Sequence, residues 1–217
     1  MLRIALTHDR QQPFNLLCLG AHSDDIEIGC GGTILRLVAE TSHLCVRWIV
    51  FSGAGTRAAE ARDSAADFLR GAAASRVDVL DFRDGYFPFQ GTEIKDHFEA
   101  LKREFDPSLV ITHWKGDAHQ DHRLIAELTH NTFRNHLVLE YETPKYDGDL
   151  SNPGFFVPLA REQMLRKIEL LRRHFATQRS RSWFTDDTFL GLARLRGIQC
   201  NAPDGLAEGF YARKLVF

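Results

Sequence analysis

The stretch Leu17–Gly32 reads LCLGAHSDDIEIGCGG, and it says more about the fold than any other part of the chain. An apolar run ends in a short turn that carries His22, Asp24 and Asp25, and a glycine-rich segment follows. A chain stabilised by packing alone has no need of three polar groups at the end of a strand. The stretch therefore predicts a strand, a functional turn and the beginning of a helix.

Outward from this stretch, apolar runs alternate with segments of helical pattern. The predicted strands are Asn15–Leu19, Cys45–Phe51, Val77–Phe82, Leu109–Thr112 and Leu137–Tyr141. The predicted helices are Gly31–Glu40, Arg57–Leu69, Ile94–Phe105, Asp121–Asn135 and Arg161–Arg173. Continuous apolar strands that alternate with helices are typical of parallel sheets buried on both faces. We therefore predict an α/β fold that is Rossmann-like and doubly wound, with a mainly parallel sheet and helices on both faces.

The pattern weakens after about residue 143. The segment 143–154, TPKYDGDLSNPG, is rich in turn-forming residues and predicts a loop. An apolar piece, Phe155–Leu159, two helical stretches and a final strand near Tyr211–Phe217 are expected to follow. We predict one domain over residues 1–217, in which the residues after about 143 form a cap.

A second polar cluster, HQDHR at residues 119–123, follows the fourth predicted strand. In doubly wound sheets, ligands bind beyond the carboxyl ends of the strands, so we expect the two clusters to meet there. A catalytic zinc ion takes three protein ligands and keeps one open position. The spacing of His22 and Asp25 can supply two of these ligands, and His119 or His122 can supply the third.

The two clusters also resemble the motifs of a known family. The segment 21–32, AHSDDIEIGCGG, resembles the A-H-P-D-D-x-E-x-G-C-G-G signature of the PIG-L/LmbE metal-dependent N-deacetylases, and HQDHR resembles their H-x-D-H-R. Weaker similarities follow at Arg57 with Glu60, at DFRDGYF in 81–87 and at KIELLRRHFATQ in 167–178. The resemblance runs in order from about residue 15 to 180.

The resemblance implies a metal centre with a separate group for proton transfer. His22, Asp25 and His122 would bind the metal, which is usually zinc, with Fe²⁺ or another divalent ion as an alternative. Asp24 would be the general base. Such an ion supplies an activated water and polarises a carbonyl. The implied reaction removes an N-acetyl or N-acyl group from an amino sugar or its conjugate.

The resemblance also implies roles for residues around this centre. His119 would be the acid or electrophilic histidine, in its protonated form, with Asp121 orienting it. Arg57 and Asp84 would contact the sugar. One departure is that some members place a tyrosine where this chain has Asp117, and an ionised carboxylate cannot assist an oxyanion.

Several nearby residues have more than one interpretation. The glycines at 29, 31 and 32 favour close packing beside the ligands over a phosphate cradle, because their spacing is not the dinucleotide fingerprint. Glu27 either supports a ligand or is an exposed residue of the first helical turn. His113, at the end of the fourth strand, either orients nearby groups or is a structural histidine, and the structural role is the one expected.

Composition narrows the partners and the location. The chain has 217 residues with 27 basic and 29 acidic side chains, so its net charge of -2 does not indicate nucleic acid or an anionic membrane as a partner. No apolar run is long enough to span a bilayer, and the N-terminus does not resemble a signal peptide, so we expect a cytoplasmic protein. The expected partner is a small N-acetylated amino sugar or glycoconjugate, and a homo-oligomer is compatible with the sequence.

Two other functions stay open. A non-haem iron oxygenase also uses two histidines and one carboxylate, although such enzymes usually have a β-sandwich scaffold. A non-catalytic module that binds a sugar or a nucleotide could keep the same fold. Asp24 and His119 argue against that module, because pure binding needs neither a base nor an acid.

Overall fold

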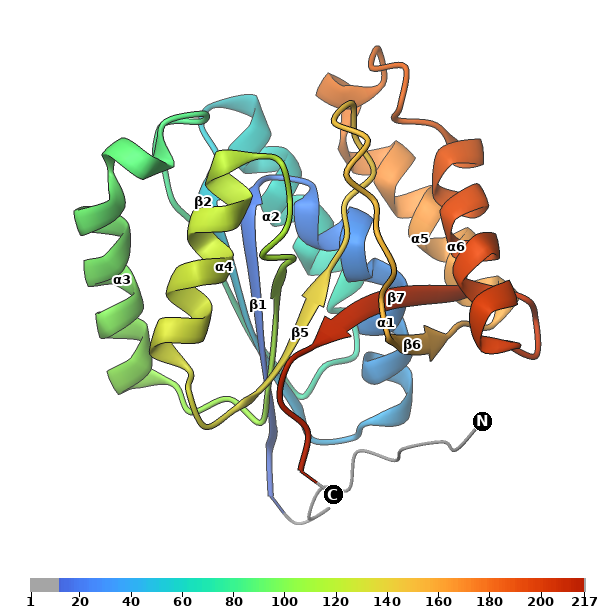
Figure 1. The fold of residues 1–217 in the computed structure, drawn as a ribbon, viewed down its shortest axis with the longest axis horizontal. Coiled ribbons are helices and arrows are strands. Elements are labelled where there is room, and N and C mark those ends of the chain that lie inside the picture. The colour runs from blue at the N-terminus through green and yellow to red at the C-terminus, as the bar shows by residue number, and fades with distance from the viewer. Residues whose placement is uncertain (1–11, 217) are drawn as a thin grey trace.

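The computed structural model of the chain describes residues 12–216, with a seven-stranded sheet at its centre (Figure 1). The strand order is β3-β2-β1-β4-β5-β7-β6. The strands are β1 Phe14–His22, β2 Leu44–Ser52, β3 Ala74–Val79, β4 Leu109–His113, β5 Leu137–Tyr141, β6 Phe155–Pro158 and β7 Ala207–Ala212. Strands β1 to β5 are parallel, whereas β7 is antiparallel to both β5 and β6. The predicted α/β class with a mainly parallel sheet is confirmed.

Helices cover both faces of this sheet (Figure 1). They are α1 Asp25–Glu40, α2 Thr56–Phe68, α3 Gly91–Glu104, α4 Gln120–Thr132, α5 Arg161–His174 and α6 Asp186–Cys200, with 3-10 turns at Phe87–Phe89 and Ala176–Gln178. Helices α1, α2 and α5 contact one another, and α3 contacts α4. The crossover helices therefore form one layer on each side of the strands, which is the doubly wound arrangement.

Strand β1 is buried on both of its faces. Leu16 and Cys18 belong to the cluster that packs under α1 and α2, whereas Leu17 and Leu19 belong to the cluster under α3 and α4. Because side chains alternate along a strand, an uninterrupted apolar run is what a central parallel strand requires. This burial fixes where β1 ends, and so it fixes the position of the polar turn that follows.

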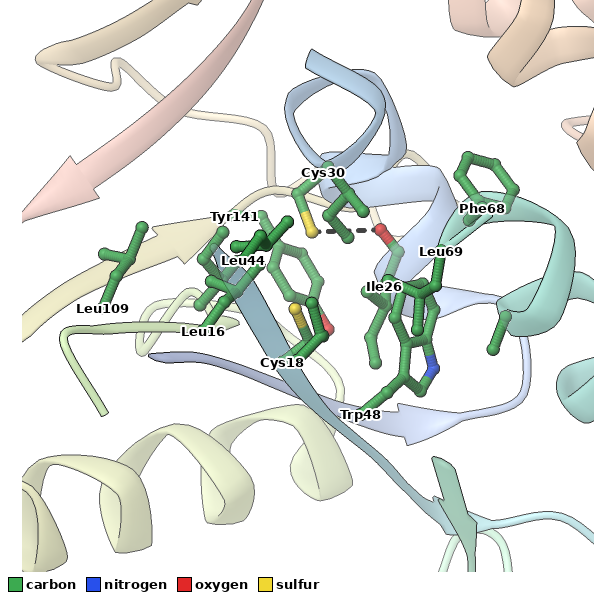
Figure 2. Packing of buried hydrophobic residues seen from close by; sticks show 14 of the residues in the cluster. Leu16, Cys18, Ile26, Cys30, Leu44, Trp48, Phe68, Leu69, Leu109 and Tyr141 are labelled. Atoms are coloured by element: carbon green, nitrogen blue, oxygen red, sulfur yellow. Dashed lines mark hydrogen bonds between the residues drawn. The ribbon is translucent and has the colours of Figure 1, made fainter. Parts of the chain in front are cut away.

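Helix α1 begins earlier than the sequence indicates and has a kink. Cys30 has the non-helical angles φ -143° and ψ 15°, and its thiol donates a hydrogen bond to the Ile26 carbonyl at 3.1 Å (Figure 2). The predicted helix Gly31–Glu40 matches the segment beyond the kink and misses the turn before it. Glycines lower helix propensity, so the sequence places the beginning of the helix within the glycine-rich segment, at Gly31.

Two predicted strands are displaced. Strand β3 was expected at Val77–Phe82, but its pairing with β2 begins at Ala74 and ends at Val79. The final strand was expected near Tyr211–Phe217, and this position is wrong because β7 is Ala207–Ala212, while Phe217 lies outside the described residues. Strand β7 carries a buried Glu208, so it lacks the apolar pattern by which a strand is recognised.

The C-terminal third completes the sheet as well as covering it. Strands β6 and β7 extend the sheet beyond β5, and α5 and α6 enclose a third apolar cluster. The loop 142–154 rises above the carboxyl end of β5 (Figure 1). Within residues 12–216, no helix has the length and apolar character needed to cross a membrane. The organisation as one domain with a cap stays a prediction.

Candidate metal centre

The two polar clusters meet at the carboxyl ends of β1 and β4. His22 is the last residue of β1, Asp25 is the first residue of α1, and His122 lies in the first turn of α4. Strands β1 and β4 are neighbours, and the chain continues from β1 to β2 on the opposite side. This is the point at which the strand order reverses, where open α/β sheets bind their ligands.

Three ligand atoms form a compact triangle at this point. His22 Nδ1 lies 3.2 Å from His122 Nε2 and 3.3 Å from Asp25 Oδ2, and the distance between the last two atoms is 3.5 Å. Ligands about 2.0–2.1 Å from a tetrahedral zinc ion are roughly 3.3 Å apart. The donor set and its spacing therefore fit a divalent metal ion with one position left open.

Other ligand-type atoms surround the same centre. Among the residues that the structure describes, the sets that could hold an ion are His22 with His119 and His122, Asp25 with His113 and His122, and His22 with Asp84, His119 and Asp121. All three sets share a residue with the triangle. The structure thus concentrates its possible metal ligands in one place.

Asp25 is held as an anion. Its Oδ2 accepts a hydrogen bond from the backbone N–H of His22 at 2.6 Å, which fixes the carboxylate across the turn. Burial by itself raises the pKa of Asp25, but His122, His113 and His22 surround the carboxylate and hold its pKa well below the ordinary value. The side chain is therefore charged over the whole physiological range.

His113 contacts the triangle, as the less expected of its two interpretations predicted. It is fully buried, its Nε2 accepts the Ala21 N–H at 2.9 Å, and it lies 3.3 Å from Asp25 Oδ2. Its ring stacks on His122 with 3.9 Å between the centroids. His113 therefore supports two members of the triangle from behind. Its position at the end of β4 was the only signal, and that position also suits a structural histidine.

Asp117 orients His122, one member of the triangle. Its Oδ2 lies 3.0 Å from His122 Nδ1, and its Oδ1 accepts the backbone N–H of His119 at 2.8 Å. A carboxylate that binds the outer nitrogen of a metal-binding histidine fixes the tautomer and raises the basicity of the ligand. Against the effect of burial, the hydrogen bond with His122 and the nearby cations hold the pKa of Asp117 far below its ordinary value. The departure from the family tyrosine thus gives this chain an orienting carboxylate.

Asp24 points away from the triangle and toward Arg57. Its Oδ1 accepts a hydrogen bond from Arg57 Nη2 at 3.1 Å, and the carboxyl group is buried. Burial raises the pKa of Asp24, and Asp25 adds to this effect, while Arg57 and His22 oppose it. A carboxyl group with a raised pKa beside a metal centre is suited to accept and return a proton.

His119 caps α4 and is a neutral donor. Its Nδ1 accepts the backbone N–H of Asp121 at 3.3 Å, so the proton of the neutral ring belongs on Nε2. Burial lowers the pKa of His119, and the neighbouring His122 and His22 lower it further. The protonated form that is expected beside the oxyanion stays a prediction, and a neutral ring is also able to donate from Nε2.

Asp121 orients a different histidine from the one expected. Its carboxylate accepts the backbone N–H groups of Gly85 at 2.7 Å and Phe87 at 3.1 Å, and its Oδ2 lies 3.3 Å from His22 Nε2. The contact with His119 is made by the backbone of Asp121, because helix capping directs that N–H toward the preceding ring. The carboxylate of Asp121 therefore fixes His22 and the loop after β3.

Arg57 and Asp84 lie at the mouth of the site. Asp84 Oδ1 is 3.1 Å from His22 Nε2, and its Oδ2 is 3.8 Å from Arg57 Nη1. The side chain of Asp84 is 57% exposed and that of Arg57 is 31% exposed. Both groups can reach an incoming molecule, and Asp84 also contacts a member of the triangle. Their contact with a sugar stays a prediction.

The glycine-rich segment packs closely and does not form a free phosphate cradle. A Cβ atom at Gly29 would lie only 2.6 Å from Cγ of the buried Tyr141 ring. The backbone N–H groups of Gly32 and Thr33, beyond the kink of α1, are bound by the Glu208 carboxylate at 2.9 and 2.7 Å. The helix dipole favours an anion at this position, and here that anion is the carboxylate of Glu208 in β7.

Glu27 is not an exposed residue of the first helical turn, because its side chain is fully buried. Its support of a ligand stays a prediction. Burial raises the pKa of Glu27 well above its ordinary value. In the folded protein, the carboxyl group of Glu27 therefore stays protonated and neutral between its ordinary pKa and the raised pKa.

The fold and the site together define an α/β protein with a cluster of histidines and aspartates, able to hold a metal ion, at the switch point of its sheet. Residues 17–133 match the family described as PIG-L: GlcNAc-PI de-N-acetylase. This range includes every residue of the triangle. The chain belongs to this family, as the resemblance of its two motifs predicted.

Three relatives illustrate the range of the similarity. The uncharacterized deacetylase YaiS of Escherichia coli (strain K12) is 25% identical over 181 residues, which cover 80% of this chain and 97% of that protein. The N,N'-diacetylchitobiose deacetylase from Pyrococcus horikoshii superposes with a TM-score of 0.69 at 20% identity, over 94% of this chain and 85% of that one. GalB, the 4-carboxy-2-hydroxymuconate hydratase from Pseudomonas putida KT2440, has a TM-score of 0.71 at 15% identity, over 94% and 97%. The last two comparisons show a shared fold, and that fold carries more than one kind of reaction.

Proposed function

We propose that this chain is a zinc-dependent hydrolase that removes an N-acetyl or N-acyl group from an amino sugar or its conjugate. Membership of the PIG-L family supports deacetylation. The observation that carries the metal dependence is the triangle of His22, Asp25 and His122, whose spacing suits a tetrahedral ion. When bound there, the ion would activate a water molecule and polarise the substrate carbonyl.

The protein groups around the triangle divide the remaining work. Asp24 takes a proton from the attacking water and returns it to the departing amine, a role that its raised pKa favours. His119 donates from Nε2 to the oxygen that becomes negative in the transition state, and a donor aimed in this way contributes about 3 kcal/mol. Asp117 and Asp121 keep His122 and His22 in the orientation that the site requires.

The substrate is proposed to be a small N-acetylated amino sugar or glycoconjugate. Arg57 and Asp84 lie at the mouth, where a guanidinium and a carboxylate can bind sugar hydroxyls from two sides. The cytoplasmic location and a homo-oligomeric assembly stay predictions from the sequence.

The two rival functions lose support from these observations. An iron oxygenase can use the same three ligands, but the doubly wound sheet and the deacetylase family favour hydrolysis. A binding module without catalysis has no use for Asp24, whose buried carboxyl group lies beside the centre with a raised pKa.

The first test is an acetate-release screen of the zinc-loaded protein against N-acetyl sugars and their conjugates. We expect release from at least one of them, and the Fe²⁺-loaded protein serves as the comparison for metal preference. Oxygen consumption by the Fe²⁺ form without acetate release would favour the oxygenase instead. No release from any compound by either form would contradict the proposal.

The second test separates the ligands from the base. Asp24→Asn is expected to keep the metal and to lose most of the turnover, whereas His122→Ala is expected to lose the metal. Metal content and acetate release are measured on the same preparations. Near-normal rates in Asp24→Asn would remove Asp24 as the base, and full metal occupancy in His122→Ala would remove His122 as a ligand.

A further inference from the structure

The loop 142–154 is anchored firmly at both of its ends. Arg196 of α6 donates to both carboxylate oxygens of Glu142 at 2.6 Å, and it donates to the Ser151 carbonyl at 2.9 Å. Arg196 and Glu142 are both buried. One guanidinium therefore holds the beginning and the end of the loop, so the part between them has a defined position.

The middle of this loop contacts the segment that leads to the metal centre. Lys145 Nζ lies 3.1 Å from Asp117 Oδ2 and 2.5 Å from Asp149 Oδ2, and its side chain is only 10% exposed. Asp149 Oδ2 also accepts the backbone N–H of Ala118 at 2.7 Å. An ammonium thus lies between two carboxylates, one from the loop and one from the site.

Asp117 connects this contact to both catalytic histidines. The oxygen that binds Lys145 is the one that binds His122 Nδ1, and the other oxygen holds the backbone N–H of His119. We propose that Lys145 is a positioning residue, through which the loop 142–154 sets the geometry of the metal ligand His122 and of His119. This inference rests on the proposed metal-dependent function.

The physical reason is the charge that Lys145 neutralises. Without its ammonium, the carboxylates of Asp117 and Asp149 face each other in a largely buried region, and like charges repel strongly there. The loop and the segment 117–119 would move apart. Asp117 would then no longer hold His122 in place, and metal affinity would fall.

The loop also presents side chains to solvent beside these inward contacts. Tyr146 is 67% exposed and Leu150 is 45% exposed, and they are the chain neighbours of Lys145 and Asp149. A substrate that touches the exposed side chains can therefore shift the residues that hold Asp117. The loop would in this way link the binding of a particular conjugate to the geometry of the centre.

The test measures Zn²⁺ affinity by competition with a chelator, so it needs no substrate. Loss of an outer partner of a metal ligand typically costs 10–100-fold in affinity. We expect a loss of about tenfold for Lys145→Met, a loss within the same 10–100-fold range for Asp117→Asn, and recovery in Lys145→Arg, which keeps the positive charge. Lys115→Met is the matched control, because Lys115 is an exposed lysine two residues from Asp117.

A double variant tests whether Lys145 acts through Asp117. If it does, adding Lys145→Met to Asp117→Asn changes the affinity by less than about twofold, whereas independent effects would multiply. The visible spectrum of the Co²⁺-loaded protein is expected to change in Lys145→Met and to stay unchanged in Lys115→Met, because it reports the geometry around the ion. If Lys145→Met does not fold, Lys145→Gln is used in its place.

The outcomes separate this inference from the function on which it rests. A wild-type protein that binds no divalent metal would contradict the proposed metal centre itself. A wild-type protein that binds Zn²⁺ tightly, with Lys145→Met as tight as Lys115→Met, would overturn the role of Lys145 alone. Full multiplication of the two losses in the double variant would show that Lys145 does not act through Asp117, and that result would also overturn it.

Discussion

The two strand–helix junctions that form the site are held by different forces. The β1–α1 junction, residues 22–33, depends on close approach of its backbone to buried side chains, as Gly29 does to Tyr141. The β4–α4 junction, residues 113–122, depends on charged groups: Asp117 with Lys145, and Asp121 with the N–H groups of residues 85 and 87. Close packing dominates at the first junction, where the Asp25 carboxylate also fixes the turn, and charged groups dominate at the second.

The difference decides what the sequence can reveal. Close approach of the backbone excludes every side chain larger than the hydrogen of glycine. The requirement therefore appears in the sequence as glycines, here in the segment GCGG at 29–32. A charge pair can be made by partners anywhere along the chain. Nothing in the sequence around Asp117 indicates that its partner is Lys145, which lies 28 positions later.

The largest effect is expected from Gly29→Ala, which tests positioning by shape. The new Cβ would force back the Tyr141 ring, which is fully buried and donates its hydroxyl to the Leu19 carbonyl at 2.9 Å. Overpacking of this kind costs about 3 kcal/mol of the free energy of unfolding. Urea denaturation of the metal-free protein measures it.

The control for this variant is Gly191→Ala in α6. No atom lies within 4 Å of a Cβ placed at Gly191, so the substitution is expected to stabilise the protein by roughly 0.5–1 kcal/mol through helix propensity. Equal effects of the two substitutions would mean that helix propensity, and not the contact with Tyr141, decides the cost at Gly29.

The sequence predicted most of the fold because its signals are local. The boundaries of β5 agree at Leu137–Tyr141, and the α/β class follows from the alternation of strands with helices. The misplaced final strand has a physical cause. The true β7 contains the buried Glu208, whose partners Lys167 and Thr33 lie in helices far away in the sequence. A strand that buries a charge has no apolar pattern to detect.

The candidate site was predictable to a similar extent. The motifs predicted His22, Asp25 and His122 as one set of ligands, and the ligand atoms of these residues do lie close together. The sequence could not supply the direction of the Asp121 carboxylate, which follows from the geometry of the α4 cap. It also could not supply the role of His113, because stacking on another ring is a property of two neighbouring elements.

The next effect in size is expected from Asp121→Asn, which tests positioning by charge. The carboxylate accepts two backbone N–H groups of the loop after β3, and an amide can replace only one of these acceptors. Hydrogen bonds to a charged group contribute 1.5–3 kcal/mol, so a loss of about 2 kcal/mol in the free energy of unfolding is expected.

Asp186→Asn gives the matched comparison on the surface. Asp186 pairs with Arg172 at 3.0 Å, but both side chains are largely exposed, and such pairs contribute less than about 1 kcal/mol. If Asp121→Asn cost no more than Asp186→Asn, the loop after β3 would not depend on the Asp121 carboxylate. The positioning of the β4–α4 junction by charge would then have lost its support from Asp121.

The smallest effect is a difference in pH dependence, and it has opposite signs at the two junctions. Glu27, at β1–α1, has a pKa raised by burial above its ordinary value of 4.5. The folded state therefore keeps a proton that the unfolded state releases, so stability falls as the pH rises from 4.5 to the raised pKa. Asp117, at β4–α4, has a pKa held below its ordinary value of 3.8 by His122 and nearby cations, against the effect of burial. Its contribution is complete above pH 3.8 and is lost as the pH falls through the lowered pKa.

Two amide variants separate these contributions in the metal-free protein. One proton bound differently by the folded and unfolded states changes the slope of stability against pH by at most about 1.4 kcal/mol per pH unit. Glu27→Gln is expected to make the slope above pH 4.5 less negative than in the wild type, and to leave the slope below pH 3.8 unchanged. Asp117→Asn is expected to change the slope below pH 3.8 and to leave the slope above pH 4.5 unchanged, because Asp117 titrates only at the acid end. Urea midpoints measured from pH 3 to pH 8 give both slopes. If Glu27→Gln left the slope above pH 4.5 as it is, Glu27 would have to be ionised in the folded protein, and the β1–α1 junction would contain a second buried charge in addition to that of Asp25. The contrast between a junction held mainly by close packing and a junction held mainly by charge would then be weaker at Glu27.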